Sequence, residues 1–378
     1  MKGLKMLRDC WGNFICGVTG PSLTSLVIVI SLNLIVFFSL SLLITPAFMM
    51  GDGHHYLMQD PWDRNVSSTA KILSIRKSET PDIVVLGDSL TVHCVAGEER
   101  LARMVTSKMG KAPSAVFDLS VPGQTSWEMA AIVEKLPPQF DGVLIIGIGP
   151  GLLSYGVEEL KDIVANPRLG FLSKALEQEA GFSGLSGPSR TGIYFIDNWR
   201  FLSARRYFIA RNLFVTGAQP TGDIFDDVNK PESPDRQNFI EQEIDDLPWL
   251  MQEYELNKNI NFDVIQRIVV NLRKRSNASF ILMEAPYNPA WNNVHGAERF
   301  FKKVHSELKT FAAKHEMSFL SATMQAALLP ADFMDYEGHL DNREAIERCS
   351  EAIATQVVKV MTKKEMVSQR DGLVKNLS

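Results

Sequence analysis

The stretch that decides the fold is Ile83-Val84-Val85-Leu86-Gly87-Asp88-Ser89-Leu90-Thr91. Four apolar residues, three of them β-branched, predict a buried strand that ends at Gly87. Ser89 follows at once, so we expect its hydroxyl at the carboxyl edge of a sheet, where open α/β folds bind ligands. A serine hydroxyl is a weak nucleophile until a base takes its proton. The motif therefore predicts a nucleophilic serine that needs a histidine from elsewhere in the chain.

The candidate base stands near the C-terminal end of the folded region. His339 follows Asp335 in the segment Asp-Tyr-Glu-Gly-His. We interpret His339 as the general base and Asp335 as the carboxylate that orients it, with Asp332 and Glu337 as alternative carboxylates. His93, close to the serine in sequence, is interpreted as part of the first turn of the next helix.

A strand followed by Gly-Asp-Ser-Leu, with an aspartate and a histidine near the end of the domain, resembles the SGNH or GDSL hydrolase superfamily. The resemblance covers roughly residues 80 to 360. It implies an α/β fold with a flavodoxin-like parallel sheet flanked by helices, and serine chemistry with no metal or cofactor. The family spaces its aspartate and histidine as D-x-x-H, whereas Asp335 and His339 are one residue further apart.

The resemblance also implies an oxyanion hole, formed by Ser89, Gly123 and a third residue. Gly123 matches the glycine of the second conserved block, whose backbone N–H is a donor. In the third block the family has G-x-N-D, but this chain places Gly149 where the asparagine is expected. We expect Gly149 or Gln124 to replace that donor in an active enzyme. Four residues of the loops at this edge are assigned to substrate binding: Asp88, Gln124, Pro286 and Asn288.

Strand and helix patterns alternate along the chain, which is typical of a parallel sheet with covering helices. Strands are predicted at 83–86, 115–119, 143–146, 280–283 and 317–320, and helices at 66–78, 96–109, from 126, 260–275, 297–315 and 344–361. Residues 150–258 interrupt the alternation. We interpret them as a helical insertion beside the active-site edge, with a helix at 199–213 and a polar, proline-rich stretch at 220–236. The SGNH-like domain is expected to span 80–362, and the tail at 363–378 is expected to fray.

An uncharged apolar run covers residues 22–50. About 20 apolar residues suffice to cross a bilayer as a helix, so the run predicts a membrane anchor. Lys2, Lys5 and Arg8 precede it, and the thirteen residues after it carry no Lys or Arg. This places residues 1–21 in the cytoplasm, a juxtamembrane linker and helix at 51–79, and the domain outside the cytoplasm. A cleaved signal peptide is the alternative, but its apolar core would be about 7–15 residues, so we favour an uncleaved anchor.

The cysteines and the overall charge bear on three further possibilities: a disulfide, a zinc site and a nucleic-acid partner. Cys94 lies five residues after Ser89 and Cys349 ten after His339, so a bridge between them is one hypothesis. Two buried, unpaired thiols are the reading that we favour. No Cys/His spacing indicates a zinc site. The net charge of −5 and the absence of a basic stripe in the sequence argue against a nucleic-acid partner.

Two functions follow from these patterns. The first is a membrane-anchored serine esterase or O-acyltransferase acting on a cell-envelope glycan or polymer, with a multipass membrane O-acyltransferase as a candidate partner that supplies the acyl group. This layout resembles the SGNH-like acyltransferases of lipoteichoic-acid D-alanylation and alginate O-acetylation. The second is a catalytically inactive SGNH-fold subunit that binds or assembles an envelope polysaccharide modification complex. Gly149 and the longer Asp–His spacing favour the second.

Overall fold

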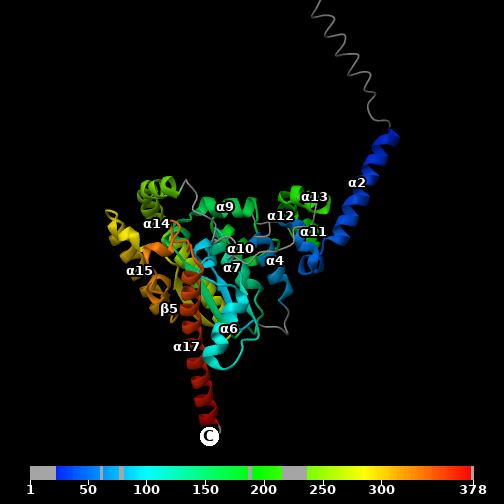
Figure 1. Cartoon of the computed structure of the whole chain (residues 1–378). Coiled ribbons are helices and arrows are strands. Elements are labelled where there is room, and N and C mark those ends of the chain that lie inside the picture. Colours follow the sequence, from blue (N-terminus) through cyan, green and yellow to red (C-terminus); the bar gives the residue numbers. More distant parts are fainter. Residues whose placement is uncertain (1–22, 60–62, 76–80, 186–189, 215–235, 376–378) are drawn as a thin grey trace, which may run out of the picture.

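Five parallel strands form the sheet that positions the site. The computed structural model describes residues 23–59, 63–75, 81–185, 190–214 and 236–375 of the chain (Figure 1). The strands are β1 Ile83–Leu86, β2 Val116–Asp118, β3 Val143–Ile148, β4 Ser279–Glu284 and β5 Ser318–Ser321. Their order is β2-β1-β3-β4-β5, with every neighbouring pair parallel. This is the flavodoxin-like order, so the predicted parallel α/β fold is confirmed.

Each face of the sheet packs into its own core. Along β1, Val84 and Leu86 join one hydrophobic cluster, whereas Ile83 and Val85 join the other. All four are fully buried. A strand covered on both faces needs apolar residues at every position, which explains the continuous apolar run in the sequence.

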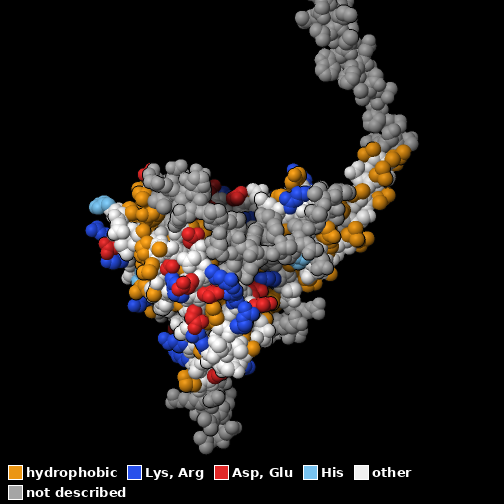
Figure 2. Space-filling view, in the orientation of Figure 1, with side chains coloured by type: hydrophobic (Ala, Val, Ile, Leu, Met, Phe, Trp, Pro, Cys, Tyr) orange, Lys and Arg blue, Asp and Glu red, His pale blue; other side chains and the backbone are white. Residues whose placement is uncertain are grey.

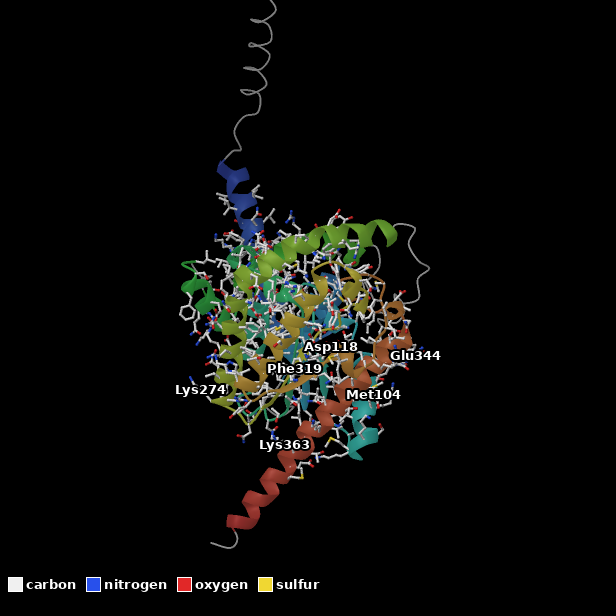
Figure 3. The ribbon with its side chains drawn as sticks, turned by 90° about the vertical axis from the view of Figure 1, so that its left-hand side faces the viewer. Met104, Asp118, Lys274, Phe319, Glu344 and Lys363 are labelled. Carbon is white, nitrogen blue, oxygen red and sulfur yellow. A yellow bond between two sulfur atoms is a disulfide. The ribbon has the colours of Figure 1, made fainter. Side chains whose placement is uncertain are left out.

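Helices cover both faces. The first core contains side chains of α7 Ser126–Lys135, α8 Pro150–Ser154, α14 Arg236–Arg273 and α15 Ala297–Lys314. The second core is closed by α6 Glu98–Met109 and α17 Arg343–Lys375. Figure 3 shows these last two helices side by side, with Met104 on α6 and Glu344 near the start of α17. A doubly wound sheet results, with its carboxyl edge open to the connecting loops.

Two helices extend beyond their predicted ends. Helix α14 begins at Arg236 rather than at 260, and it continues through Pro248. Leu247 and Tyr254 are buried in the same core as the later part of α14, so packing supports the longer helix. Helix α17 runs to Lys375, and Lys364 donates a hydrogen bond to the Asp141 carbonyl. The helix thus includes residues 363–375 of the stretch in which fraying is expected, and residues 376–378 lie outside the described part.

The interruption of the alternation is helical, as predicted. It contains α9 Val157–Ala165, α10 Lys174–Phe182, α11 Tyr194–Asp197, α12 Trp199–Ala204 and α13 Arg206–Phe214. The single helix predicted at 199–213 is two helices that break at Arg205. Most of the predicted polar stretch at 220–236 falls on residues 215–235, which lie outside the described part. Helix α4 Arg64–Ser74 corresponds to the helix predicted at 66–78.

The apolar run near the N-terminus is not one continuous helix. Helix α2 Leu23–Leu43 is followed by a bend and by α3 Pro46–Met50, whose first turn is capped by the Thr45 side chain. Met49 is fully buried in a small cluster with Leu57, so the end of the predicted anchor packs against the domain. Figure 1 shows α2 projecting from the domain, and Figure 2 shows its apolar side chains on the surface. Among the described residues, no helix combines the length and the apolar character needed to cross a membrane.

A threonine packed against two glycines fixes the turn after β1. Thr91 belongs to the short helix α5 Ser89–Val92 and is fully buried. A Cβ atom at Gly87 or at Gly147 of β3 would collide with the Thr91 side chain. Both positions therefore need glycine for space, and the close packing sets the direction in which α5 leaves the sheet.

The cysteine pair corrects one expectation. Cys94 and Cys349 form a disulfide, with their Cα atoms 5.3 Å apart. The favoured reading of two unpaired thiols is therefore wrong, and the bridge hypothesis is the one that the structure supports. The reason is topological: Cys94 lies just beyond α5, and α17, which carries Cys349, packs on the same face of the sheet. The bond links two segments 255 residues apart in sequence.

Candidate active site

Ser89, His339 and Asp335 form a hydrogen-bonded series at the carboxyl edge of the sheet. The Ser89 Oγ atom lies 2.8 Å from His339 Nε2, and His339 Nδ1 lies 2.6 Å from Asp335 Oδ2. In this arrangement Nδ1–H donates to the carboxylate, which leaves Nε2 as the acceptor for the serine proton. The geometry is that of a nucleophile, a base and an orienting carboxylate.

The strand and the turn after it place Ser89. It is the first residue of α5, immediately after β1, at the point where the chain order of the sheet reverses between β1 and β3. Asp88 caps α5, since its Oδ1 accepts the Leu90 N–H at 3.1 Å. The Ser89 N–H is in the first turn of a helix and has no intrahelical acceptor.

The loop before α17 places His339. Asp335 Oδ1 accepts the backbone N–H groups of Gly338 and His339, each at 2.9 Å, while Oδ2 holds the imidazole. Gly338 has a φ of +124°, and a Cβ there would collide with the Pro286 carbonyl. The Asp335 carboxylate thus bonds to both the backbone and the side chain of the segment that ends at His339. These bonds hold the segment in place although it is one residue longer than D-x-x-H.

The two alternative carboxylates have other surroundings. Asp332 accepts from Arg348 Nη2 at 2.6 Å and from the Leu329 N–H at 2.7 Å. Glu337 Oε2 lies 3.7 Å from His339 Nδ1, and its side chain is 63% exposed. Asp335 is therefore the carboxylate that the geometry assigns to the histidine. The side chains of Asp335, Glu337 and His339 are also close enough to hold a metal ion, but the first and third are already bonded to each other.

The pKa values follow from burial and from this pairing. Burial opposes the charged form of His339, but the hydrogen bond and charge of Asp335 outweigh it and raise the pKa of His339. Burial likewise opposes ionisation of Asp335, but the bonds from His339 and from the backbone N–H groups lower its pKa. Burial raises the pKa of Asp88 to about 6, although the charge of His339 acts in the opposite direction.

His93 packs beside the base without replacing it. Its ring lies edge-on to the His339 ring, with centroids 5.0 Å apart, and its Nδ1 lies 3.2 Å from the Leu340 carbonyl oxygen. Burial, together with the charge of His339, lowers the pKa of His93 to about 4. His93 is therefore a neutral ring that supports the His339 ring, in line with its assignment outside the base.

The loop after β2 brings Gly123 to this edge. The Val121 N–H donates to the Gly87 carbonyl at 2.9 Å, which fastens the loop to the end of β1. Gly123 has a φ of +66°, and its N–H has no acceptor among the described residues. Gly149 lies beside the turn that follows β1: a Cβ atom on Gly149 would stand 3.9 Å from Asp88 Oδ2. Leu90 Cδ1 fills part of the space in which a side chain on residue 149 would stand, at 3.1 Å from that Cβ.

Two of the four residues assigned to substrate binding, Gln124 and Asn288, make structural hydrogen bonds through their amide groups. Gln124 is buried; its Oε1 accepts the Gly87 N–H and its Nε2 donates to the Leu119 carbonyl, each at 2.9 Å. Its side chain ties the end of β1 to the end of β2, and this uses one of the two N–H donors of Nε2. Asn288 donates to the Asp335 carbonyl at 2.8 Å and accepts the Ala290 N–H at 2.9 Å. The two amide groups thus hold the loops together, and a substrate contact by either residue stays a prediction.

The other two residues assigned to substrate binding are Pro286 and Asp88, and their surroundings differ. Pro286 is buried with its carbonyl against Gly338, so it supports the histidine loop, and its role in substrate binding stays a prediction. Asp88 is 7% exposed; its Oδ1 accepts the Leu90 N–H, and its Oδ2 lies on the side of Gly149. A substrate contact by Asp88 stays a prediction.

Two residues from the insertion reach the Gly123 loop. Arg168 Nη2 donates to the Gly123 carbonyl at 2.6 Å, and its Nε donates to Glu128 Oε1 at 2.9 Å. The Tyr155 hydroxyl lies 3.8 Å from the position that a Cβ on Gly123 would occupy. Neither residue stands in a recognisable motif, so sequence reasoning missed both. The insertion does lie beside the active-site edge, as predicted.

Comparison with protein-family models and with curated proteins finds no match. Among solved structures, the chain is similar to a GDSL-like lipase of Bacteroides thetaiotaomicron, with 11% sequence identity and a TM-score of 0.35. The alignment covers 79% of this chain and 97% of the lipase.

Proposed function

We propose that this protein is a serine acyl-transfer enzyme in which Ser89 is the nucleophile, His339 the general base and Asp335 the group that orients His339. The observation that carries the proposal is the unbroken series of 2.8 Å and 2.6 Å contacts through the two nitrogens of one imidazole. An imidazole bonded on one side to a hydroxyl and on the other to a carboxylate is suited to activating that hydroxyl.

The chemistry follows from the positions of these atoms. His339 Nε2 takes the Ser89 proton as Oγ bonds to the carbonyl carbon of an acyl ester. The negative charge that develops on the carbonyl oxygen faces the N–H groups of Ser89 and Gly123, which stabilise it. The proton on His339 then passes to the departing alcohol, leaving an acyl-serine. Water or a second hydroxyl, deprotonated by His339, then bonds to the acyl carbon. The bond from that carbon to Ser89 Oγ breaks, and Oγ takes the proton back from His339.

The test is labelling of the full-length protein with a fluorophosphonate, which phosphonylates an activated serine. We expect labelling of the wild type and none of Ser89→Ala. Ser67→Ala is a matched control, because Ser67 lies on α4 and its hydroxyl donates to the Arg64 carbonyl. If neither the wild type nor Ser89→Ala is labelled, the proposal is contradicted, and a binding or assembly subunit with the same fold is favoured.

We further propose that the acyl acceptor or donor is a cell-envelope glycan or polymer, and that the domain works outside the cytoplasm while the N-terminal apolar segment holds it at a membrane. A multipass membrane O-acyltransferase would then be the source of the acyl group. The uncharged run at 22–50 and the Cys94–Cys349 bond support the location, since disulfides persist in oxidising compartments.

The redox state of the bridge in cells tests this location. In a variant with Cys10 and Cys16 replaced by serine, only Cys94 and Cys349 remain. We expect both to resist alkylation in intact and freshly lysed cells until a reductant is added. Immediate alkylation of both thiols would contradict placement outside the cytoplasm, and it would leave the acyl-transfer chemistry unaffected.

A further inference from the structure

The oxyanion region has room for a donor beyond the backbone. Gly123 has a positive φ, and its N–H has no acceptor among the described residues. Gly149 contributes no side chain there, and the buried Gln124 amide is hydrogen-bonded to the Gly87 N–H and to the Leu119 carbonyl. The insertion brings two further side-chain donors to Gly123: Arg168 Nη1 and Tyr155 Oη lie 3.1 Å and 3.8 Å from a Cβ position there, and Arg168 already bonds to the Gly123 carbonyl and to Glu128.

Tyr155 supplies a hydroxyl at this point. It follows α8, and its carbonyl is held by Asn261 Nδ2 at 2.8 Å, which anchors its backbone to α14. Asn261 is itself held by the Ser126 hydroxyl of α7 at 2.6 Å. From this fixed backbone the ring reaches back so that Oη lies 3.8 Å from a Cβ position on Gly123. The hydroxyl makes no hydrogen bond with any residue that the structure describes.

The electrostatic surroundings keep this hydroxyl protonated. Burial and the nearby Asp88 carboxylate raise the pKa of Tyr155, although Arg168 acts in the opposite direction. A tyrosine that keeps its proton at neutral pH can donate a hydrogen bond to an oxyanion without losing the proton to it.

We propose that the Tyr155 hydroxyl is a third oxyanion donor, acting beside the backbone N–H groups of Ser89 and Gly123. The inference rests on the proposed acyl-transfer function. As Ser89 Oγ bonds to the carbonyl carbon, the carbonyl oxygen gains charge and accepts a hydrogen bond from Tyr155 Oη–H. No proton is transferred, and the bond is released when the carbonyl forms again in the acyl-serine.

The experiment compares Tyr155→Phe with the wild type on p-nitrophenyl acetate, using the full-length protein. Removing a single oxyanion donor costs roughly 10²–10³-fold in kcat, so we expect a loss of about that size with KM within threefold. Tyr194→Phe is the matched control, because it removes a hydroxyl that donates to the Gly170 carbonyl at 2.6 Å, away from the serine. We expect its kcat to stay within twofold of the wild type.

A boronic acid that mimics the tetrahedral adduct gives a second readout. Tyr155→Phe should weaken its inhibition by the same factor as kcat/KM, because both depend on the charged oxygen. An unchanged kcat, or a change in KM alone, overturns the role of Tyr155 while Ser89 labelling stays intact. Loss of fluorophosphonate labelling in the wild type would instead overturn the proposed function and this inference with it. A melting temperature equal to that of the wild type shows that Tyr155→Phe is folded.

Discussion

Replacing His339 by alanine is expected to lower kcat/KM for p-nitrophenyl acetate by a factor on the order of 10⁴–10⁶, as for other enzymes whose nucleophile and base act as a unit. The reason is that His339 Nε2, which lies 2.8 Å from Ser89 Oγ, accepts the proton of the Ser89 hydroxyl. His295→Ala is the matched control, since His295 is exposed at the start of α15. A variant of His339 that keeps more than a tenth of wild-type activity would contradict its role as the base.

The pH profile checks the same assignment from another direction. The base works in its neutral form, so kcat/KM should rise with pH through the pKa of His339, which Asp335 holds above the ordinary value of about 6.5. The Asp335→Asn variant loses the carboxylate charge that raises the pKa of His339. It keeps the burial that lowers this pKa. The acid limb of the profile should therefore move to lower pH as kcat falls.

Removing the disulfide is expected to lower the free energy of unfolding by about 2–5 kcal/mol. The Cys94–Cys349 bond closes a loop of 255 residues in sequence, and restricting such a loop chiefly limits the freedom of the unfolded chain. The measurement is urea unfolding of the variant with Cys94→Ala and Cys349→Ala against the oxidised wild type. Alanine suits both sites because the cysteines are fully buried among apolar residues.

The control for this experiment removes the other two cysteines. A protein with Cys10→Ala and Cys16→Ala should unfold at the same urea concentration as the wild type. Adding reductant should lower the stability of this control and of the wild type, and leave the variant with Cys94→Ala and Cys349→Ala unchanged. Coinciding curves for the oxidised and reduced control would show that the bond does not contribute to the stability of the native protein.

The sheet could be predicted because its signals are local. Continuous apolar runs such as the one ending at Leu86 need covering on both faces, and that requirement is visible within a few residues. The Gly-Asp-Ser turn is equally local, since it occupies the positions directly after the strand. Pairing Ser89 with His339 needed one further assumption, that a serine at a sheet edge requires a base.

The remaining features depend on contacts between distant segments. Gln124 looks like a polar loop residue that could face a ligand, but its amide is used by Gly87 and Leu119. Asn288 is similar, since its partner is the carbonyl of Asp335, 47 residues away. Tyr155 carries no motif, and its position near Gly123 results from packing by the insertion. No periodicity or spacing in the sequence contains that information.

Thr91, wedged between the backbones of Gly87 and Gly147, couples three positions that a sequence comparison would treat as independent. A lineage that acquired alanine at either glycine would first have to shorten the side chain at 91, since the intermediate with both groups present has no room for them. Substitutions at 87, 91 and 147 should accordingly appear together across evolution. Anyone grafting the serine turn onto another scaffold would need to carry the glycine of the neighbouring strand along with it.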